Sequence, residues 1–222
     1  MIRFDKVSKI YKDGSIALKD IDLAIEYREF VSIIGHSGAG KTTLLKMLLA
    51  EEFPTEGGVY VEASEIRQLD KWELNELRRK IGVIFQDFRL LPHKTVYENV
   101  AFAMEVAGRF DQEIESDVPY ALELVGLEHK AFSFPAELSG GEKQRAAIAR
   151  AIVNQPDVVI ADEPTGNLDP SNTYDIVQIL KKINDLETTV ILATHNTGII
   201  ENLNNRTITI DKGVIVDDVK SN

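Results

Sequence analysis

The stretch GHSGAGKTT, residues 35–43, has the most specific chemical pattern in the sequence. It fits the P-loop pattern, and it lies between an apolar run and an expected helix, which is the context that this phosphate-binding loop requires. The amides of such a loop can surround phosphate oxygens, Lys41 can reach the β- and γ-phosphates, and Thr42 can offer its hydroxyl to Mg²⁺. A plain glycine-rich turn is the alternative. The residues expected to bind a nucleotide here are Gly35, His36, Ser37, Gly38, Ala39, Gly40, Lys41, Thr42 and Thr43.

Two adjacent acids, Asp162 and Glu163, follow the apolar run VVIA. This pattern places both carboxylates at the C-terminal edge of a central strand, where open α/β sheets bind their ligands. One acid can hold Mg²⁺ through water, and the other can orient or deprotonate an attacking water. Two merely solvated acids are the alternative, which the P-loop in the same chain makes the weaker interpretation.

Three single residues could complete such a site. His195 closes the apolar run TVILATH and Gln86 closes IGVIFQ, so both are expected at strand ends. The imidazole could contact a γ-phosphate or the water, and the amide could contact the metal or the water. Tyr11 follows an alternating run and could stack on a purine. A lone histidine is more often structural, and Tyr11 is equally open to an ordinary packing role.

A second glycine-rich stretch, ELSGGEKQRAAIAR at residues 137–150, begins an otherwise good helix. Ser139 and Glu142 are three residues apart and fit a capping box. A capping box does not explain Gly140 and Gly141, each of which weakens a helix by up to about 1 kcal/mol. The two glycines therefore predict that something approaches the backbone closely at this helix start.

The surrounding pattern predicts a mixed sheet with helices. IRFDKVSKIY and DIDLAIEY alternate apolar and polar residues, as half-exposed antiparallel strands do, whereas FVSIIG, VVIAD and TVILATH are apolar runs typical of strands covered on both faces. Helices are expected to begin at Lys41, Asp70, Thr95 and Pro170.

About seventy residues between IGVIFQ and VVIAD contain no strand-like run. We interpret this span as a helical insert. The expected organisation is one domain, residues 1–222, with a core of approximately 1–86 and 157–222 and an insert of approximately 87–156. Near the C-terminus, RTITIDKGVIVDDV predicts a hairpin with DKG at its turn.

The overall composition restricts the class of protein. The 222 residues suffice for one sizeable α/β domain, and the net charge of −11 argues against a general nucleic-acid-binding protein. There are no cysteines, and no apolar run is long enough to cross a bilayer. Because the N-terminus also lacks the features of a signal peptide, we expect a cytoplasmic protein.

Taken together and in order, these motifs resemble the nucleotide-binding subunit of ATP-binding-cassette (ABC) proteins over essentially the whole chain. The resemblance matches each family motif to one position or range: Tyr11 to the aromatic A-loop, Gly35 to Thr42 to Walker A, Gln86 to the Q-loop, Leu138 to Glu142 to the signature, Asp162 and Glu163 to Walker B, Gly166 to Asp169 to the D-loop, and His195 to the switch histidine.

The resemblance implies the ABC ATPase form of the α/β P-loop NTPase fold. That fold has a mixed and parallel core sheet, an antiparallel β subdomain and a helical subdomain that carries the signature. It also implies a homodimer formed on Mg·ATP, in which the signature of one copy faces the γ-phosphate held by the other. The implied catalytic residues are Lys41, Gln86, Glu163 and His195; the implied metal ligands are Thr42, Gln86 and, through water, Asp162; the implied nucleotide contacts in trans are Ser139, Gly140, Gly141 and Glu142.

Within the family, the sequence is similar to bacterial cell-division ATPases that pair with a permease-like integral membrane protein. Residues 85–108 correspond to the region that holds the partner's coupling segments, which implies a place on the inner face of the plasma membrane. The ATPase of a lipoprotein-releasing or macrolide-type exporter is the nearest alternative. A soluble ABC protein acting on DNA or ribosomes and a module that senses ATP without hydrolysis are more distant ones.

Overall fold

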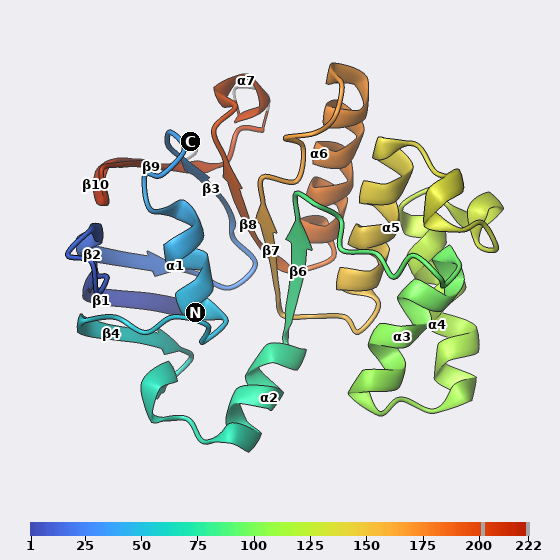
Figure 1. Cartoon of the computed structure of the whole chain (residues 1–222), viewed down its shortest axis with the longest axis horizontal. Coiled ribbons are helices and arrows are strands. Elements are labelled where there is room, and N and C mark those ends of the chain that lie inside the picture. Colours follow the sequence, from blue (N-terminus) through green and yellow to red (C-terminus); the bar gives the residue numbers. More distant parts are fainter. Residues whose placement is uncertain (201–202, 221–222) are drawn as a thin grey trace. The chain divides into compact units, whose positions relative to one another are not determined.

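The computed structural model describes residues 1–200 and 203–220. The chain forms two compact units, which are described separately below (Figure 1). The first unit comprises Met1–Arg78 and Thr189–Asn222, and the second comprises Arg79–Thr188.

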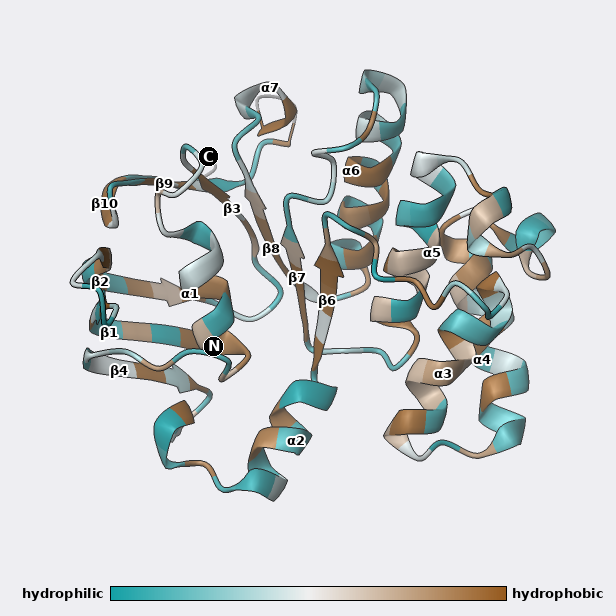
Figure 2. Cartoon of the chain, in the orientation of Figure 1, coloured by the Kyte–Doolittle hydropathy of each residue, from teal (hydrophilic) through white to brown (hydrophobic). Residues whose placement is uncertain are grey.

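An antiparallel sheet forms one part of the first unit. Its strands, in spatial order, are β2 (Ile16–Ile25), β1 (Ile2–Ile10), β4 (Glu56–Val61) and β5 (Ser64–Glu65). Buried and exposed residues alternate along much of β1, as the sequence predicts, and Figure 2 shows the matching change of hydropathy along the strand. The sequence pattern did not reveal β4, because its EGGVYV run contains two glycines. Gly57 explains one of them, since a Cβ there would lie 2.3 Å from the Lys6 carbonyl oxygen.

A mixed set of strands forms the other part of the first unit. Strand β3 (Phe30–Ile34) pairs in parallel with β8 (Thr189–Thr194) and with β9 (Arg206–Asp211), and β9 pairs antiparallel with β10 (Val214–Val219). Strands β3 and β8 are buried almost throughout, as their apolar runs predict. The C-terminal hairpin prediction is confirmed as well.

Short helices complete the first unit. They are α1 (Lys41–Leu48), the 3₁₀ turn Ile66–Gln68, α2 (Lys71–Arg79) and α7 (Thr197–Ile200). The predicted start of α1 is confirmed. For α2 the predicted start at Asp70 is the cap rather than the first helical residue, because the Asp70 carboxylate accepts from the amides of Trp72 and Glu73 at 2.8 and 2.9 Å.

The second unit combines two parallel strands with helices. Strand β6 (Ile81–Phe85) pairs in register with β7 (Val158–Asp162). The other elements are α3 (Val96–Ala107), α4 (Asp111–Leu124), the 3₁₀ turns Glu128–Lys130 and Pro135–Glu137, α5 (Gly140–Ile152) and α6 (Pro170–Asp185). Residues 86–157 are all described and none of them is in a strand, which agrees with the helical character predicted for this span.

Helix α6 begins at Pro170 as predicted, whereas for α3 the predicted start at Thr95 is the cap and the helix begins at Val96. Thr95 and Glu98 form a capping box at α3, and Asp169 caps α6 immediately before Pro170. Helix α3 packs against α4 and α5, and α5 packs against α6.

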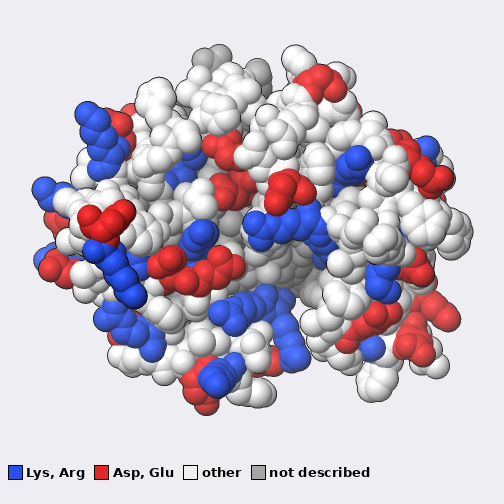
Figure 3. Space-filling view, viewed as in Figure 1, with Lys and Arg blue, Asp and Glu red and all other residues white. Residues whose placement is uncertain are grey.

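No helix within residues 1–200 and 203–220 combines the length and the apolar character that crossing a bilayer demands. On the face drawn in Figure 3, Lys and Arg are interspersed with Asp and Glu rather than gathered in one basic surface. This distribution agrees with the acidic net charge.

A buried arginine joins the C-terminal hairpin to the rest of the first unit. Arg206, 9% exposed, donates to both oxygens of Asp218 at 2.7 and 2.6 Å, to the Ala24 carbonyl at 2.8 Å and to Glu29 at 3.1 Å. The hydrogen bonds with Asp218 raise the pKa of the guanidinium and lower the pKa of the Asp218 carboxyl below its ordinary value.

Replacing Asp218 by Ala should lower the free energy of unfolding by about 1 kcal/mol at pH 7, because the side chain is partly open to solvent. Since folding lowers the pKa of Asp218, its contribution is complete above the ordinary value of 3.8 and is lost as the pH falls through the folded value. Urea unfolding at pH 7 and at pH 3 to 4 would measure this. The exposed neighbour Asp217→Ala serves as control, and a deficit in D218A that stays constant down to pH 3 would contradict the assignment.

Candidate functional site

The P-loop of the first unit is built around a buried lysine. Lys41 is 5% exposed, and its ammonium donates to the carbonyl oxygens of Gly35 at 2.6 Å and His36 at 3.2 Å. Gly38 and Gly40 have φ angles of 80° and 112°, a region that other residues adopt only with strain. The lysine hydrogen bonds and the two left-handed glycines together curve the loop backbone around the Lys41 ammonium.

The start of α1 suits an anion. Its cap, Gly40, offers no side-chain hydrogen bond, and its first turn contains no acid. The first amides of a helix have no acceptor within the helix, and the helix dipole places partial positive charge there. In contrast, side chains of Thr95, Ser139 and Asp169 cap α3, α5 and α6. The loop therefore fits the phosphates of a nucleotide.

Backbone from elsewhere in the first unit supports this loop. The Gly213 amide donates to the Ala39 carbonyl at 2.9 Å, and the Gly213 carbonyl accepts from the Lys19 amide at 2.8 Å. A Cβ on Gly40 would lie 2.6 Å from the Ala17 carbonyl oxygen, and one on Gly35 would lie 2.3 Å from that of Ile210. Sequence reasoning missed this role of the hairpin turn, although the glycine in DKG was a signal.

Tyr11 lies at the same loop. Its hydroxyl is 3.3 Å from the Thr43 hydroxyl, so the structure brings these two predicted nucleotide contacts together. The ring is half-buried, and the Lys9 ammonium lies 5.2 Å from the ring centroid.

His195 and the P-loop begin at corresponding positions of adjacent strands. Ile34 at the end of β3 pairs with Thr194 at the end of β8, and Gly35 and His195 are the next residues. His195 is exposed. The prediction that His195 follows a strand end is confirmed.

The second unit aligns its own candidate residues in the same manner. Phe85 pairs with Asp162, so Gln86 and Glu163 directly follow two paired strand ends. Glu163 has a φ angle of 50°, the left-handed region. Backbone strain of this kind at an acidic strand end is typical of functional sites. The turn continues with a hydrogen bond from the Gly166 amide to the Glu163 carbonyl at 3.1 Å.

Gln86 is held by the residues of the D-loop. Its Nε2 donates to Asn167 Oδ1 at 3.4 Å, and Asn167 Nδ2 donates to the Gln86 carbonyl at 3.2 Å. A Cβ on Gly166 would lie 2.7 Å from Gln86 Nε2. Sequence reasoning placed Gly166 and Asn167 in a motif but gave neither a role at Gln86.

Side chains of α3 and α5 hold the loop after Gln86 through hydrogen bonds to its backbone. Arg150 donates to the carbonyl oxygens of Arg89 at 2.5 Å and Phe88 at 2.9 Å, and desolvation lowers the pKa of its guanidinium. Buried Asn99 exchanges hydrogen bonds with the backbone of Leu91. Helix α5, which begins at the signature, therefore also holds the loop that follows Gln86.

The helix start at Ser139 is a complete capping box. The Ser139 amide donates to Glu142 Oε2 at 2.7 Å, and the Glu142 amide donates to Ser139 Oγ at 3.3 Å. The hydrogen bond from the Ser139 amide lowers the pKa of the Glu142 carboxyl. The Ser139 amide is thus already engaged within the chain, so the first-turn amides of Gly140 and Gly141 are the ones left to an anion.

The two glycines have different structural reasons. A Cβ on Gly141 would lie 2.0 Å from Asn172 Oδ1, so the absence of a side chain here lets α6 of the same unit pack closely. A Cβ on Gly140 would lie 3.5 Å from the Leu168 side chain and 4.0 Å from the Asn167 carbonyl oxygen, which are ordinary contacts. Gly140 is also exposed. Packing within the unit therefore explains Gly141 and leaves Gly140 unexplained.

The family model described as ABC transporter matches residues 18–166, two thirds of the chain. This chain belongs to the ABC transporter family. Relatives named cell division ATP-binding protein FtsE are 50% identical in Bacillus subtilis, over 98% of this chain and 96% of the relative, and 44% identical in Escherichia coli, over 96% of each. The prediction of an ABC ATP-binding subunit similar to FtsE is confirmed.

Solved structures agree on the ABC ATPase fold. The dimeric post-hydrolysis structure of the ATP-binding cassette MJ0796, bound to ADP and Pi, has a TM-score of 0.89, 37% identity, and coverage of 100% of this chain and 99% of that one. The cbiO1 protein of Clostridium perfringens, part of an ABC transporter complex, has a TM-score of 0.91, 31% identity, and coverage of 99% and 88%. The predicted fold class is confirmed.

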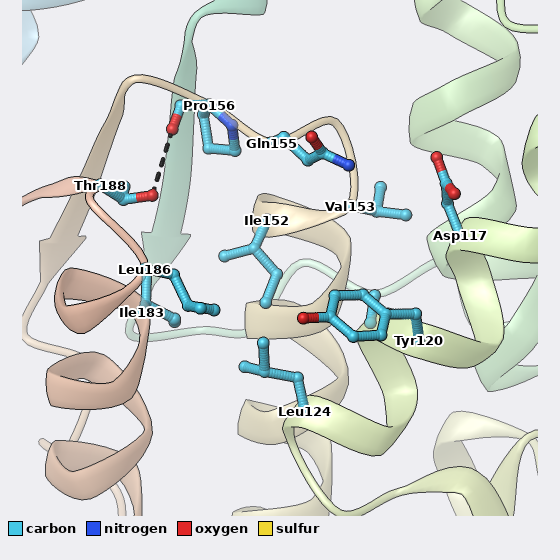
Figure 4. Close-up of a pocket in the computed structure, with 11 residues that line it drawn as sticks. Asp117, Tyr120, Leu124, Ile152, Val153, Gln155, Pro156, Ile183, Leu186 and Thr188 are labelled. Carbon is cyan, nitrogen blue, oxygen red and sulfur yellow. Dashed lines mark hydrogen bonds between the residues drawn. The ribbon is translucent and has the colours of Figure 1, made fainter.

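A separate pocket of about 280 Å³ lies in the second unit of this ABC chain (Figure 4). Side chains of α4, the end of α5 and the end of α6 line it, including Tyr120, Leu124, Ile152 and Leu186. None of the predicted nucleotide-binding or catalytic residues is among its lining residues, so it is no part of the candidate ATP site.

The support under the P-loop can be tested by Gly213→Ala. This change combines a φ of 81° with a Cβ that would lie 2.7 Å from the Ala17 carbonyl oxygen. We expect ATP affinity, measured by calorimetric titration, to fall several-fold although residue 213 has no predicted contact with the nucleotide. Gly108→Ala is the matched control, because its φ is 79° and nothing lies within 4 Å of the added Cβ. Equal ATP affinity in wild type and G213A would refute the supporting role.

The two signature glycines should respond differently to alanine. Gly141→Ala should lower the free energy of unfolding by about 1–3 kcal/mol through its collision with Asn172. Gly140→Ala should be neutral or slightly stabilising, since alanine favours the helix by up to about 1 kcal/mol. Urea unfolding would measure both.

An Asn172→Ala background provides the control for the collision. The cost of Gly141→Ala should shrink there, because the Asn172 oxygen that the new Cβ meets is gone. A cost that is unchanged in this background would show that something other than Asn172 excludes a side chain.

Proposed function

We propose that two copies of this chain bind Mg·ATP head to tail and hydrolyse it to ADP and phosphate. The observation that carries the proposal is Gly140, an exposed glycine at a helix start that packing within the unit does not require. Its amide and that of Gly141 offer partial positive charge to an anion on another copy. A second solved structure of the MJ0796 cassette, 38% identical to this chain, is likewise dimeric.

The proposed binding roles follow the residue types. Tyr11 stacks on the adenine, and residues 35–43 surround the phosphates, with Lys41 balancing their charge. Oxygen donors suit Mg²⁺, and the chain offers the Thr42 hydroxyl, the Gln86 amide and, through water, the Asp162 carboxylate. When bound, Mg²⁺ neutralises charge on the transferring phosphoryl group.

The proposed chemical step uses residues at the two strand edges. Glu163 orients a water and accepts its proton while the water oxygen attacks the γ-phosphorus. The bond to the bridging oxygen breaks, and ADP leaves with that electron pair. Lys41 and the signature amides stabilise the charge that develops, and His195 contacts the γ-phosphate or the water.

We further propose that the pair drives a conformational change in an FtsX-like membrane protein during bacterial cell division. FtsE relatives supply the cell-division role by name. Supporting surface features lie in and beside residues 85–108: Val106 and Phe132 are 66% and 82% exposed, and the Phe132 ring stacks on Tyr97 with centroids 6.4 Å apart. We assign these exposed apolar side chains to the proposed docking surface.

The docking surface would place the chain peripherally on the inner face of the plasma membrane. Residues 87–156, proposed as the helical insert, would carry both this surface and the signature. A lipoprotein-releasing or macrolide-type exporter remains the alternative assignment, because its ATPase would use the same chemistry. Purification of a tagged copy from cells, followed by identification of the membrane protein bound to it, separates the two.

Glu163→Gln is the decisive variant for the ATPase assignment. Glutamine keeps the shape and cannot accept the proton, so ATP should remain bound and the signature should stay engaged. With Mg·ATP, E163Q should elute from a sizing column as a dimer and release no phosphate, whereas Lys41→Ala should stay monomeric. E163Q that turns over ATP at the wild-type rate would refute the mechanism.

A further inference from the structure

The geometry points to Asn167 as a positioning residue that fixes which end of the Gln86 amide faces the metal. The inference rests on the proposed function, because a role for Gln86 at Mg²⁺ belongs to that proposal. What it adds is a partner for the glutamine within the same unit.

The contact between the two side chains is reciprocal. Gln86 Nε2 donates to Asn167 Oδ1 at 3.4 Å, and Asn167 Nδ2 donates to the main-chain carbonyl of Gln86 at 3.2 Å. Both hydrogen bonds are exposed to solvent, so each contributes only modestly to stability. Together they hold one side chain and one carbonyl in a single arrangement.

A metal distinguishes the two ends of an amide, which are nearly equal in shape. Mg²⁺ takes oxygen ligands, whereas the amide nitrogen carries protons and repels a cation. Because Asn167 engages the nitrogen of Gln86, the oxygen is the end directed away from the D-loop turn. Asn167 therefore selects the orientation that can serve a metal.

The Gln86 side chain packs against the backbone of the D-loop. A Cβ on Gly166 would lie 2.7 Å from Nε2 and 3.1 Å from Cδ of Gln86, so the side chain rests against bare backbone. The turn that presents Asn167 is closed by hydrogen bonds from Gly166 to Glu163 and from Leu168 to Thr165, both 3.1 Å. The turn that begins at the proposed general base thus also positions the proposed metal ligand.

The first readout concerns the chain without nucleotide. In ¹⁵N-labelled full-length protein, the Gln86 side-chain amide signals, assigned by their loss in Gln86→Glu, should shift in Asn167→Ala. The shift should be smaller in Asn167→Asp, because an aspartate oxygen still accepts from Nε2 although the donor to the Gln86 carbonyl is lost. Gln112→Ala, an exposed change on α4, is the matched control. Unchanged Gln86 signals in N167A would overturn the contact.

The second readout concerns metal affinity with ATP present. An unheld side chain spends only a fraction of its time in the competent orientation, and apparent affinity falls by that fraction. N167A should raise the half-saturating Mn²⁺ concentration about 3- to 10-fold, measured by electron paramagnetic resonance, and N167D, which keeps one of the two hydrogen bonds, should recover part of the loss. Half-saturation in N167A equal to that of wild type would refute the positioning role.

A Gln86→Glu background separates orientation from general damage. Glutamate presents oxygen at both ends and has no orientation to select, so adding N167A there should not change Mn²⁺ affinity further. An equal loss in both backgrounds would show that Asn167 acts through the fold instead. If E163Q fails to form an ATP-bound dimer, the proposed function fails, while the nucleotide-free signals of Gln86 still decide the contact.

Discussion

Close approach between backbones under the phosphate loop is the constraint on which the first unit depends. Gly35 and Gly40 lie against the carbonyl oxygens of Ile210 and Ala17, and Gly213 is hydrogen-bonded to the loop itself. A side chain at Gly35 would collide with the C-terminal hairpin, and one at Gly40 or Gly213 would collide with β2. The ion pairs of Arg206 hold that hairpin from its other end. The anion site is therefore maintained by residues that no nucleotide needs to touch.

The second unit uses strand register for the same purpose. Pairing of Phe85 with Asp162 brings Gln86 and Glu163 to the ends of adjacent strands. From there the chain is fixed on both sides, because Asn167 engages Gln86 and Arg150 engages the carbonyls of the following loop. Arg150 belongs to the helix that begins at the signature, so the loop that leads to the proposed partner surface and the signature helix share one support.

The signature itself shows two reasons for glycine in neighbouring positions. Gly141 leaves room for the Asn172 side chain of the same chain. The Asn172 side-chain amide in turn donates a hydrogen bond to the Asp169 carboxylate. Gly140 has no such neighbour, and we attribute it to a second copy. The capping box is present in addition, so the helix start is stabilised by its own side chains and still presents two amides.

The sequence by itself determined the motifs, their order, the buried strands β3, β7 and β8, and the starts of α1 and α6, because these depend on local patterns of apolar residues, caps and glycines. It also predicted the membership in the ABC family that the comparisons confirmed. It missed β4, in which Gly57 serves a contact with β1. Only the tertiary structure decided which glycine faces which neighbour, and that Asn167 meets Gln86, because those contacts join residues far apart in the chain. Local pattern carries no information about such distances, whereas the packed sheet and helices fix them.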